Sequence, residues 1–480
     1  MTDAAAPPPT AVTLTAAQRA RAILGGSAGN LVEWYDWFAY AAFTLYFAPH
    51  FFPKGDQTVQ LLQAAAVFFL GFVARPVGAW LMGHYADRSG RRAALSVSVS
   101  LMCAGALIIA LTPDYKTIGL FAPAVLLIAR VLQGLSVGGE YGASATYMSE
   151  MAGRSRRGFW SSFHYVTLIA GQLIALAVLI ILQRLLDKDD LAAWGWRIPF
   201  VIGALLAVVV FWIRRGLDES ASFKAADKPA EGIGKAQRNL ASLFFVLTLA
   251  AGGWALARPG LTPQVLAGAF LVAFFATLIA PLLRRHPRET LMIMGLTAGG
   301  SLTFYVYTTY MQKFLVNSAG FDKTAAAEIS AVSMIVFMLM QPIAGWLSDK
   351  VGRKPLLIAA YGGGALTIWP IMSGIAATDS IGVALALIIV GMTFQSGYTS
   401  ISAVVKAELF PAHVRALGVA LPYAVANVLF GGTAEMVGLA FKHAGLESAF
   451  YVYVAGIMTM GLGVAVLLRD TAKHSLIAED

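Results

Sequence analysis

The chain has 480 residues, of which 58% are hydrophobic and 13% are charged, whereas soluble domains contain about 25% charged residues. This composition excludes a soluble enzyme and a nucleic-acid-binding factor, and it predicts an integral membrane protein built from α-helices. The formal net charge of +9 is expected to lie in cytoplasmic loops rather than to bind nucleic acid.

Apolar segments in both halves of the chain are long enough to cross a hydrocarbon core of about 30 Å as helices. Those of the first half are expected at 22–48, 60–83, 93–112, 119–142, 159–183 and 195–213. Those of the second half are expected at 291–312, 325–346, 356–376, 381–405, 415–441 and 448–468. Two further apolar runs lie between the halves, at 241–257 and 264–283, and predict an inserted hairpin. The sequence thus predicts twelve plus two spans.

These spans predict how the chain is organised. Basic residues collect in the loops on one side, which places both termini in the cytoplasm. The expected regions are a tail at 1–20, a six-helix bundle at 21–215, a linker at 216–240, the hairpin at 241–283, a second six-helix bundle at 284–470 and a tail at 471–480.

One loop pattern occurs at the same place in both halves, after the second span. The copies are Gly83-His-Tyr-Ala-Asp87-Arg88-Ser-Gly90-Arg91-Arg92 and Gly345-Trp-Leu-Ser-Asp349-Lys350-Val-Gly352-Arg353-Lys354. Two copies in register predict parallel six-helix repeats, and the pattern resembles the loop signature of the major facilitator superfamily.

The aspartate of this pattern can stabilise a helix N-terminus or pair with the arginine four residues later. Contacts of this kind, made only while the cytoplasmic side is closed, bias a two-state equilibrium. We therefore expect gating roles for Gly83, Asp87, Arg91, Asp349 and Arg353. The alternative is a solvated basic loop that only sets topology. Glu140, near the cytoplasmic end of the fourth span, is a further candidate gating residue.

Two carboxylates lie inside the first predicted span. Glu33 and Asp36 follow Asn30 and precede Tyr40 at helical spacing, which places all four along one stripe. Glu33 lies about 16 Å from the start of the span, near the middle of the membrane. Because ionised groups cost about 2.5–3.5 kcal/mol each there, both acids are not expected to stay ionised, and one is expected to carry a coupled proton. In the alternative, structural arginines neutralise both.

Arg75 in the second span and Arg130 in the fourth are the natural partners of carboxylates, and Gln133 follows Arg130 by one turn. A guanidinium can hold a carboxylate in a bidentate pair. These residues, together with Tyr40, are expected to bind either the acids of the first span or an anionic substrate, and the sequence leaves both possibilities open.

Three more polar residues are candidates for the transport path. His164 in the fifth span is a candidate proton relay, although a lone histidine is more often structural. Tyr310 and Lys313, near the outer end of the span at 291–312, are candidates for substrate binding. Their alternatives are an interface anchor and a snorkelling lysine.

The sequence contains neither the phosphate-binding pattern Gly-x-x-x-x-Gly-Lys-Ser/Thr nor His-Glu-x-x-His. We therefore expect no enzyme, no ATP-driven pump, no metal and no cofactor, and a proton gradient is the expected energy source. The single cysteine, Cys103, lies in an apolar run and suggests no disulfide and no metal site.

Several stretches resemble the metabolite:proton symporter branch of the major facilitator superfamily. They include Gly29-Asn-Leu-Val-Glu-Trp-Tyr-Asp36, Arg75-Pro76-Val-Gly78, Tyr307-Thr-Thr-Tyr-Met-Gln-Lys313 and Lys406-Ala-Glu408-Leu-Phe-Pro411. The resemblance implies a twelve-helix proton symporter in a bacterial inner membrane that takes up a small di- or tricarboxylate, with α-ketoglutarate as the best guess. The hairpin at 241–283 departs from this pattern.

Other substrates and classes compete with this interpretation. A related branch takes up zwitterionic osmolytes such as proline or betaine, and other acids such as citrate or shikimate also fit the family. Buried Arg75, Arg130 and Lys313 favour an anion, whereas a quaternary ammonium calls for an aromatic cage. A membrane sensor would need an attached signalling domain. The expected partners are the substrate, the proton and the bilayer. The chain is expected to be a monomer, with the hairpin outside the transport path as the candidate contact between copies.

Overall fold

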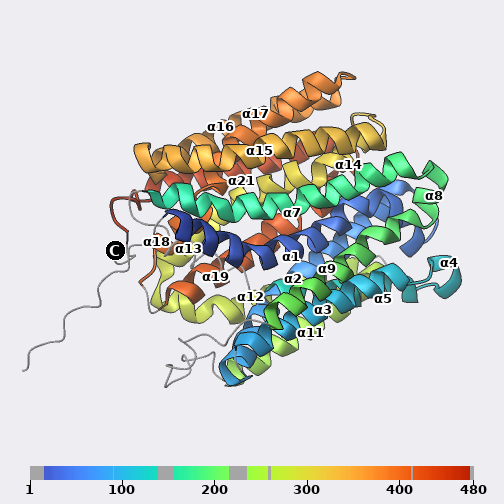
Figure 1. The fold of residues 1–480 in the computed structure, drawn as a ribbon, viewed down its shortest axis with the longest axis horizontal. Helices are drawn as coiled ribbons and strands as arrows, with labels where there is room; N and C mark the ends of the chain where they lie inside the picture. Colours follow the sequence, from blue (N-terminus) through green and yellow to red (C-terminus); the bar gives the residue numbers. More distant parts are fainter. Residues whose placement is uncertain are drawn as a thin grey trace, which may run out of the picture.

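The computed structural model describes residues 16–89, 91–138, 156–215, 235–257, 261–411 and 414–475, and every regular element within these ranges is helical (Figure 1). Nine helical segments of the described part are long and apolar enough to cross a membrane, and three shorter apolar helices accompany them. The prediction of an all-helical membrane fold is confirmed. The expected region boundaries stay predictions.

Within its described residues the first half contributes six long helices, and short helices occur in its loops. The long helices are α1 (Ala16–Phe51), α2 (Gln57–Ser89), α3 (Arg91–Leu111), α5 (Phe121–Val137), α7 (Arg157–Leu185) and α9 (Ile198–Arg215). Helices α2 and α5 approach so closely that a Cβ atom at Gly134 or Gly138 would overlap the backbone of α2. Small residues thus allow close helix packing at this contact.

The second half repeats the arrangement, with two spans interrupted by π-helical turns. Its spans are α13 (Pro287–Tyr305) with η3 (Val306–Tyr310) and α14 (Met311–Asn317), α15 (Lys323–Val351), α16 (Arg353–Ala376), α17 (Ile381–Thr399) with α18 (Ser402–Glu408), α19 (Arg415–Ala426) with η4 (Asn427–Gly432) and α20 (Ala434–His443), and α21 (Glu447–Leu467). Both π-helical turns lie next to buried charged residues. Such turns occur often at functional sites.

The two halves meet along two helix pairs, α7 with α15 and α2 with α20. At the first contact, a Cβ atom on Gly345 would lie 2.5 Å from the carbonyl oxygen of Gly158. Only residues without a side chain permit this approach. Further contacts between the halves join α7 to α18, α2 to α19 and η4, and α1 to η3.

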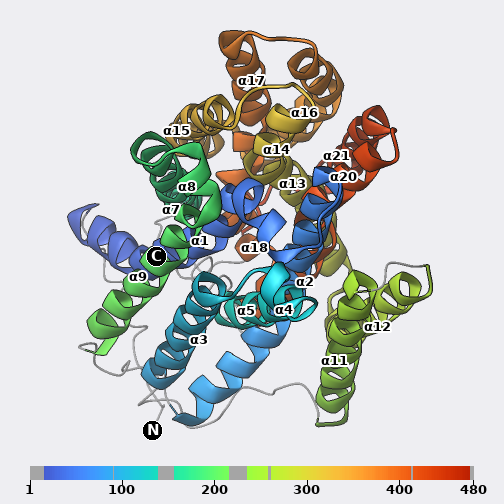
Figure 2. The same cartoon turned by 90° about the vertical axis from the view of Figure 1, so that its right-hand side faces the viewer.

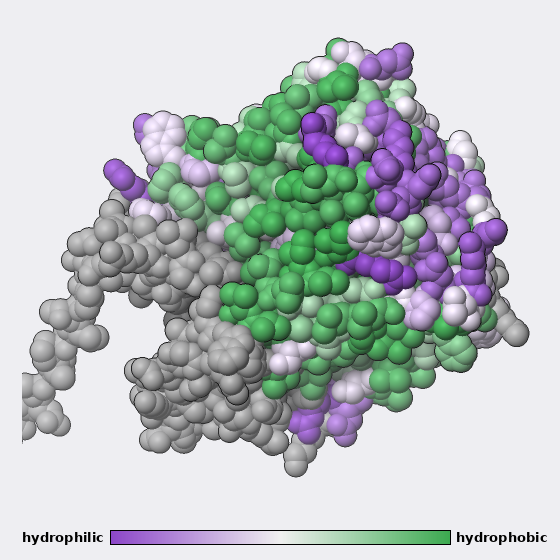
Figure 3. All heavy atoms as spheres, turned by 45° about the vertical axis from the view of Figure 1, so that its right-hand side comes forward, coloured by the Kyte–Doolittle hydropathy of each residue, from purple (hydrophilic) through white to green (hydrophobic). Residues whose placement is uncertain are grey.

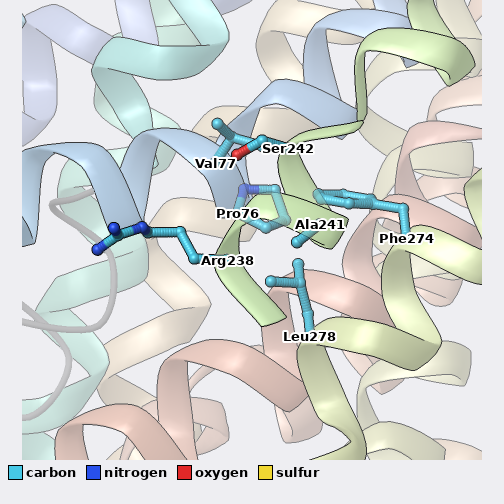
Figure 4. A pocket seen from close by; sticks show the side chains of 7 residues that line it. All are labelled: Pro76, Val77, Arg238, Ala241, Ser242, Phe274 and Leu278. Carbon is cyan, nitrogen blue, oxygen red and sulfur yellow. The ribbon is translucent and has the colours of Figure 1, made fainter. Parts of the chain in front are cut away.

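The predicted insertion forms two antiparallel helices, α11 (Lys235–Ala257) and α12 (Leu261–Arg285). Helix α11 begins at Lys235, six residues before the predicted run. The pair lies at the edge of the molecule (Figure 2) and contacts α2 of the first half and α13 and α19 of the second. Between α2 and the pair lies a small hollow (Figure 4), lined by Pro76, Val77, Arg238, Ala241, Ser242, Phe274 and Leu278.

The molecular surface matches a bilayer environment. Apolar side chains extend across the middle of the view in Figure 3, and polar ones gather toward one end. Large apolar residues such as Leu366 and Leu467 remain exposed, which a lipid environment accommodates and water does not.

Candidate functional site

Asp36 and Arg130 are joined through Gln133 inside the first half. Gln133 Nε2 donates to Asp36 Oδ2 at 2.6 Å, and Arg130 Nη1 donates to Gln133 Oε1 at 2.6 Å. All three side chains are at most 1% exposed. A Cβ atom on Gly203 of α9 would lie 2.7 Å from Asp36 Oδ1, so the glycine makes room for the carboxylate. The carboxyl group of Asp36 on α1 and the guanidinium of Arg130 on α5 are thus both buried in the first half.

The Trp37 ring lies against both buried arginines. The Cζ atoms of Arg75 and Arg130 each lie 3.9 Å from its ring centroid. Arg75 also lies 4.0 Å from the Phe72 ring, and Arg130 lies 4.4 Å from the Tyr40 ring. Cation–π contacts of this kind stabilise a desolvated guanidinium by about 2 kcal/mol or more. Aromatic faces therefore keep two positive charges inside the protein while leaving their N–H groups for another acceptor.

Both guanidiniums retain unused donors. Nε and Nη2 of Arg75 and the same two atoms of Arg130 are buried, and none has a hydrogen-bond partner among the residues that the structure describes. Unsatisfied buried donors are costly, at about 1–3 kcal/mol each. A carboxylate accepts two parallel hydrogen bonds from one guanidinium, so an anion that reaches these donors removes the cost.

The remaining polar residues of the first span take different positions. Glu33 is 2% exposed and interacts electrostatically with Arg75, whereas Asp36 is oriented toward Gln133. Asn30 accepts a hydrogen bond from Trp34 and donates one to Thr167 of α7. The Tyr40 hydroxyl donates to the carbonyl oxygen of Ala64 on α2 at 2.8 Å. The polar stripe of α1 therefore makes hydrogen bonds to three helices, α7, α2 and α5.

Lys313 is fully buried in the second half and does not snorkel to the surface. Its Nζ lies 3.3 Å from Glu435 Oε2 and donates to the carbonyl oxygen of Ala41 on α1 at 2.6 Å. Tyr310 packs against Phe450 of α21, with ring centroids 5.3 Å apart. Lys313 therefore links the two halves directly, and Tyr310 lies inside the second half.

His164 lies on α7, fully buried, beside Lys406 of the second half. One group of candidate residues surrounds Trp37 in the first half. Lys313 lies elsewhere, on α14 between Glu435 of α20 and Ala41 of α1, and His164 lies on α7, which packs against α18.

The second copy of the loop pattern contacts the opposite half. Asp349 accepts hydrogen bonds from the backbone N–H groups of Gly158 and Phe159, at 2.8 and 2.9 Å, and so caps the N-terminus of α7. Arg353 Nη1 lies 2.8 Å from the same carboxylate. Gly352 adopts a φ of 96°, which a side chain would disfavour.

Arg157 Nη1 and Glu408 Oε1, 3.7 Å apart, form an ion pair between the halves at this end. The surroundings of Gly83, the side chains of Asp87 and Arg91, and the whole of Glu140 lie outside what the structure describes.

Some residues of this arrangement were not among the sequence candidates. Glu435, Glu408, Arg157 and Lys406 are each at most 4% exposed. The signal that indicates them is a charged residue within or next to an apolar span, because such residues are rare there and usually functional.

The fold and this site define a secondary transporter of the major facilitator class. The chain belongs to the sugar (and other) transporter family, which matches residues 22–478. It is 45% identical to the alpha-ketoglutarate permease of Escherichia coli (strain K12), with 95% of each chain covered.

More distant relatives extend the comparison. Identity to the citrate-proton symporter of Salmonella typhi is 31%, with 96% of each chain covered. Among solved structures, the partially occluded inward open conformation of the xylose transporter XylE from E. coli matches with a TM-score of 0.66 at 18% identity, covering 94% of this chain and 98% of that one. The predictions of the family, of the major facilitator fold and of a transporter rather than an enzyme are confirmed.

Proposed function

We propose that this protein carries a small organic carboxylate, with α-ketoglutarate as the expected substrate, together with a proton across the bacterial inner membrane. The observation that carries the proposal is the pair of buried guanidiniums on Trp37, whose four unused donor atoms suit a carboxylate. The printed names of an alpha-ketoglutarate permease and a citrate-proton symporter among the relatives support the same substrate class.

Asp36 is the proposed proton carrier, assisted by Glu33, with His164 as a relay. Asp36 lies one hydrogen-bonded step from Arg130, so its charge and the charge of a bound anion act on the same guanidinium. A proton on Asp36 leaves Arg130 uncompensated and favours the substrate carboxylate. When Asp36 loses that proton, its carboxylate again compensates the charge of Arg130 through Gln133, and the substrate is released. Movement of the proton is thereby coupled to movement of the substrate.

Arg75 and Arg130 are the proposed substrate ligands, positioned by Gln133 and by the rings of Trp37 and Tyr40. Lys313 and Tyr310 complete the proposed path on the second half. Since Lys313 donates to Ala41 of α1, separation of the halves breaks this bond and makes one N–H of the ammonium available to an entering anion, while Glu435 stays paired with it.

The loop pattern supplies the proposed gate. Asp349, paired with Arg353, joins α15 to α7, and movement of the halves has to break the contact between Asp349 and α7. The equivalent roles of Gly83, Asp87, Arg91 and Glu140 in the first half follow from the repeat. Both termini are proposed to be cytoplasmic, in line with the positive-inside distribution. The chain is proposed to act as a monomer, with α11 and α12 as the candidate contact between copies.

Uptake into proteoliposomes tests the proposal. Purified protein is reconstituted, and accumulation of labelled α-ketoglutarate, citrate and betaine is measured with and without an inward proton gradient. Accumulation of α-ketoglutarate that requires the gradient supports the proposal. Gradient-driven uptake of citrate alone would change the substrate, and uptake of betaine alone would contradict the role of the arginines.

A further inference from the structure

A proline near the end of α1 leaves one backbone carbonyl group without its helical partner. Pro49 lies inside α1 and has no N–H, so the carbonyl oxygen of Leu45, four residues earlier, lacks the hydrogen bond that a helix normally supplies. Leu45 is 2% exposed, and a buried carbonyl group needs a donor from elsewhere. A donor from outside α1 is therefore expected at this point.

The donor comes from the opposite half of the protein. Lys323 is the first residue of α15, and its Nζ donates to the carbonyl oxygen of Leu45 at 3.1 Å. The same Nζ lies 4.6 Å from the ring centroid of Tyr46. A cation at the N-terminus of a helix is disfavoured by the helix dipole, and here a carbonyl group and an aromatic face of α1 compensate the lysine.

Neighbouring contacts join the same helix ends. Gln183, near the end of α7, donates from Nε2 to the Tyr46 hydroxyl at 2.8 Å and to the carbonyl oxygen of Lys323 at 3.3 Å. Arg184 Nη2 lies 2.6 Å from Glu328 Oε1 of α15, but both side chains are largely exposed, and such a pair contributes little. Four residues thus form a bonded cluster between the halves, the outer latch: Leu45, Tyr46, Gln183 and Lys323.

The outer latch and the proposed gate at Asp349 lie at opposite ends of the same helix pair. Helix α15 begins at Lys323 and ends at Val351, whereas α7 begins at Arg157, beside Asp349, and ends at Leu185. With both termini in the cytoplasm, as proposed, the outer latch faces the outside. An alternating transporter opens one end at a time, so the bonds at each end set how often that end opens.

We propose that the outer latch is the outer gate of the transporter, and that Lys323 closes it by supplying the donor that Pro49 removes from α1. When the halves separate at this end, water reaches both the Leu45 carbonyl group and the lysine, and neither is left unsatisfied. When this end closes without the lysine, the carbonyl group is buried without a donor. Lys323 therefore stabilises the closed state selectively. The inference goes beyond the proposed function, because it holds for any substrate.

Distances between spin labels, measured without substrate in lipid nanodiscs, test this inference. One label is attached at Lys54→Cys, in the exposed loop between α1 and α2, and the other at Asp379→Cys, in the exposed loop between α16 and α17. Cys103→Ala removes the single native cysteine. The readout is the ratio of the long-distance, open population to the short-distance, closed population.

Lys323→Met removes the donor and keeps a side chain of similar length. We expect the ratio of open to closed protein to rise about tenfold, which is the effect of one hydrogen bond to a charged group on an equilibrium constant. Lys442→Met is the matched control, because Lys442 also donates to a backbone carbonyl group, that of Asn317 at 2.7 Å, but within the second half. Its ratio should equal that of the unmodified protein.

Pro49→Ala tests the role of the carbonyl group. The alanine restores an N–H that can bond to the Leu45 carbonyl oxygen within α1. Lys323→Met combined with Pro49→Ala should therefore lose most of the tenfold rise, and the two changes should not be additive. An unchanged ratio in Lys323→Met overturns the gate. A rise that Pro49→Ala does not reduce overturns the role assigned to the Leu45 carbonyl group.

Should Lys323→Met not fold, Gln183→Leu decides the matter, because it removes the bonds to the Tyr46 hydroxyl and to the Lys323 carbonyl oxygen. A higher ratio of open to closed protein in that variant supports the outer latch, and an unchanged ratio overturns it. The measurement uses no substrate, so this inference and the proposed carboxylate transport fail independently of each other.

Discussion

Asp36→Asn separates proton coupling from substrate binding. The amide has the shape of the carboxylate, and its oxygen can accept the hydrogen bond that Gln133 Nε2 now donates to Asp36 Oδ2 at 2.6 Å. The amide nitrogen then takes the place of Oδ1, which is buried next to Gly203 and has no partner among the described side chains. The variant therefore keeps the local packing and loses the group that exchanges a proton.

The expected magnitudes follow from this geometry. An unsatisfied buried donor costs about 1–3 kcal/mol, which is partly offset because the variant no longer buries a carboxylate. The protein should therefore still fold. For one coupled proton, a gradient of about one pH unit is equivalent to about 1.4 kcal/mol and supports about tenfold accumulation. Without the carrier, accumulation should fall to the level of equilibration.

The assay compares two modes of transport in the same proteoliposomes. Gradient-driven accumulation of labelled α-ketoglutarate should be lost in Asp36→Asn, while exchange of internal for external substrate should continue. Asp189→Asn, in the exposed helix α8 (Lys188–Ala193), is the matched control and should retain both modes. Tenfold accumulation in Asp36→Asn at unchanged proton dependence would refute the assignment of the proton to this residue.

Three further changes test other parts of the site. Arg130→Lys should weaken α-ketoglutarate binding about 10- to 100-fold in calorimetry, because an ammonium lacks the planar fork; wild-type affinity would exclude a bidentate pair. Asp349→Ala removes the cap of α7, worth about 1–2 kcal/mol, and should shift spin-label distances between α7 and α15 toward a cytoplasm-open state; an unchanged distribution would remove Asp349 from the gate. Deletion of 241–283 should leave the substrate preference and proton coupling in proteoliposomes unchanged, because α11 and α12 contact the bundles only from the edge; a well-expressed variant with altered preference would place them in the mechanism.

The sequence alone was sufficient for the fold and the class of protein. Apolar runs of membrane length, the two copies of the loop pattern and the basic loops are local or repeated features, and each depends only on neighbouring residues. The acids and arginines inside spans could also be found without a structure, because a charge in hydrocarbon is rare and needs a reason. Helix α11 begins six residues before its apolar run, because the more polar segment from Lys235 to Asn239 continues the same helix.

Only the tertiary structure decided which charges meet. Spacing places Glu33 and Asp36 on one stripe, yet Asp36 reaches Gln133 and Arg130, whereas Glu33 interacts with Arg75. The position of Lys313 near the end of its span allowed a snorkelling side chain, but in the structure the side chain is buried against Glu435 and α1. Periodicity fixes the direction of a side chain relative to its own helix, but not the rotation and crossing of that helix against its neighbours. Those depend on packing between residues far apart in the chain, such as the glycine contacts between α2 and α5 and between α7 and α15. The pairing of charges across helices is therefore a property of the folded protein.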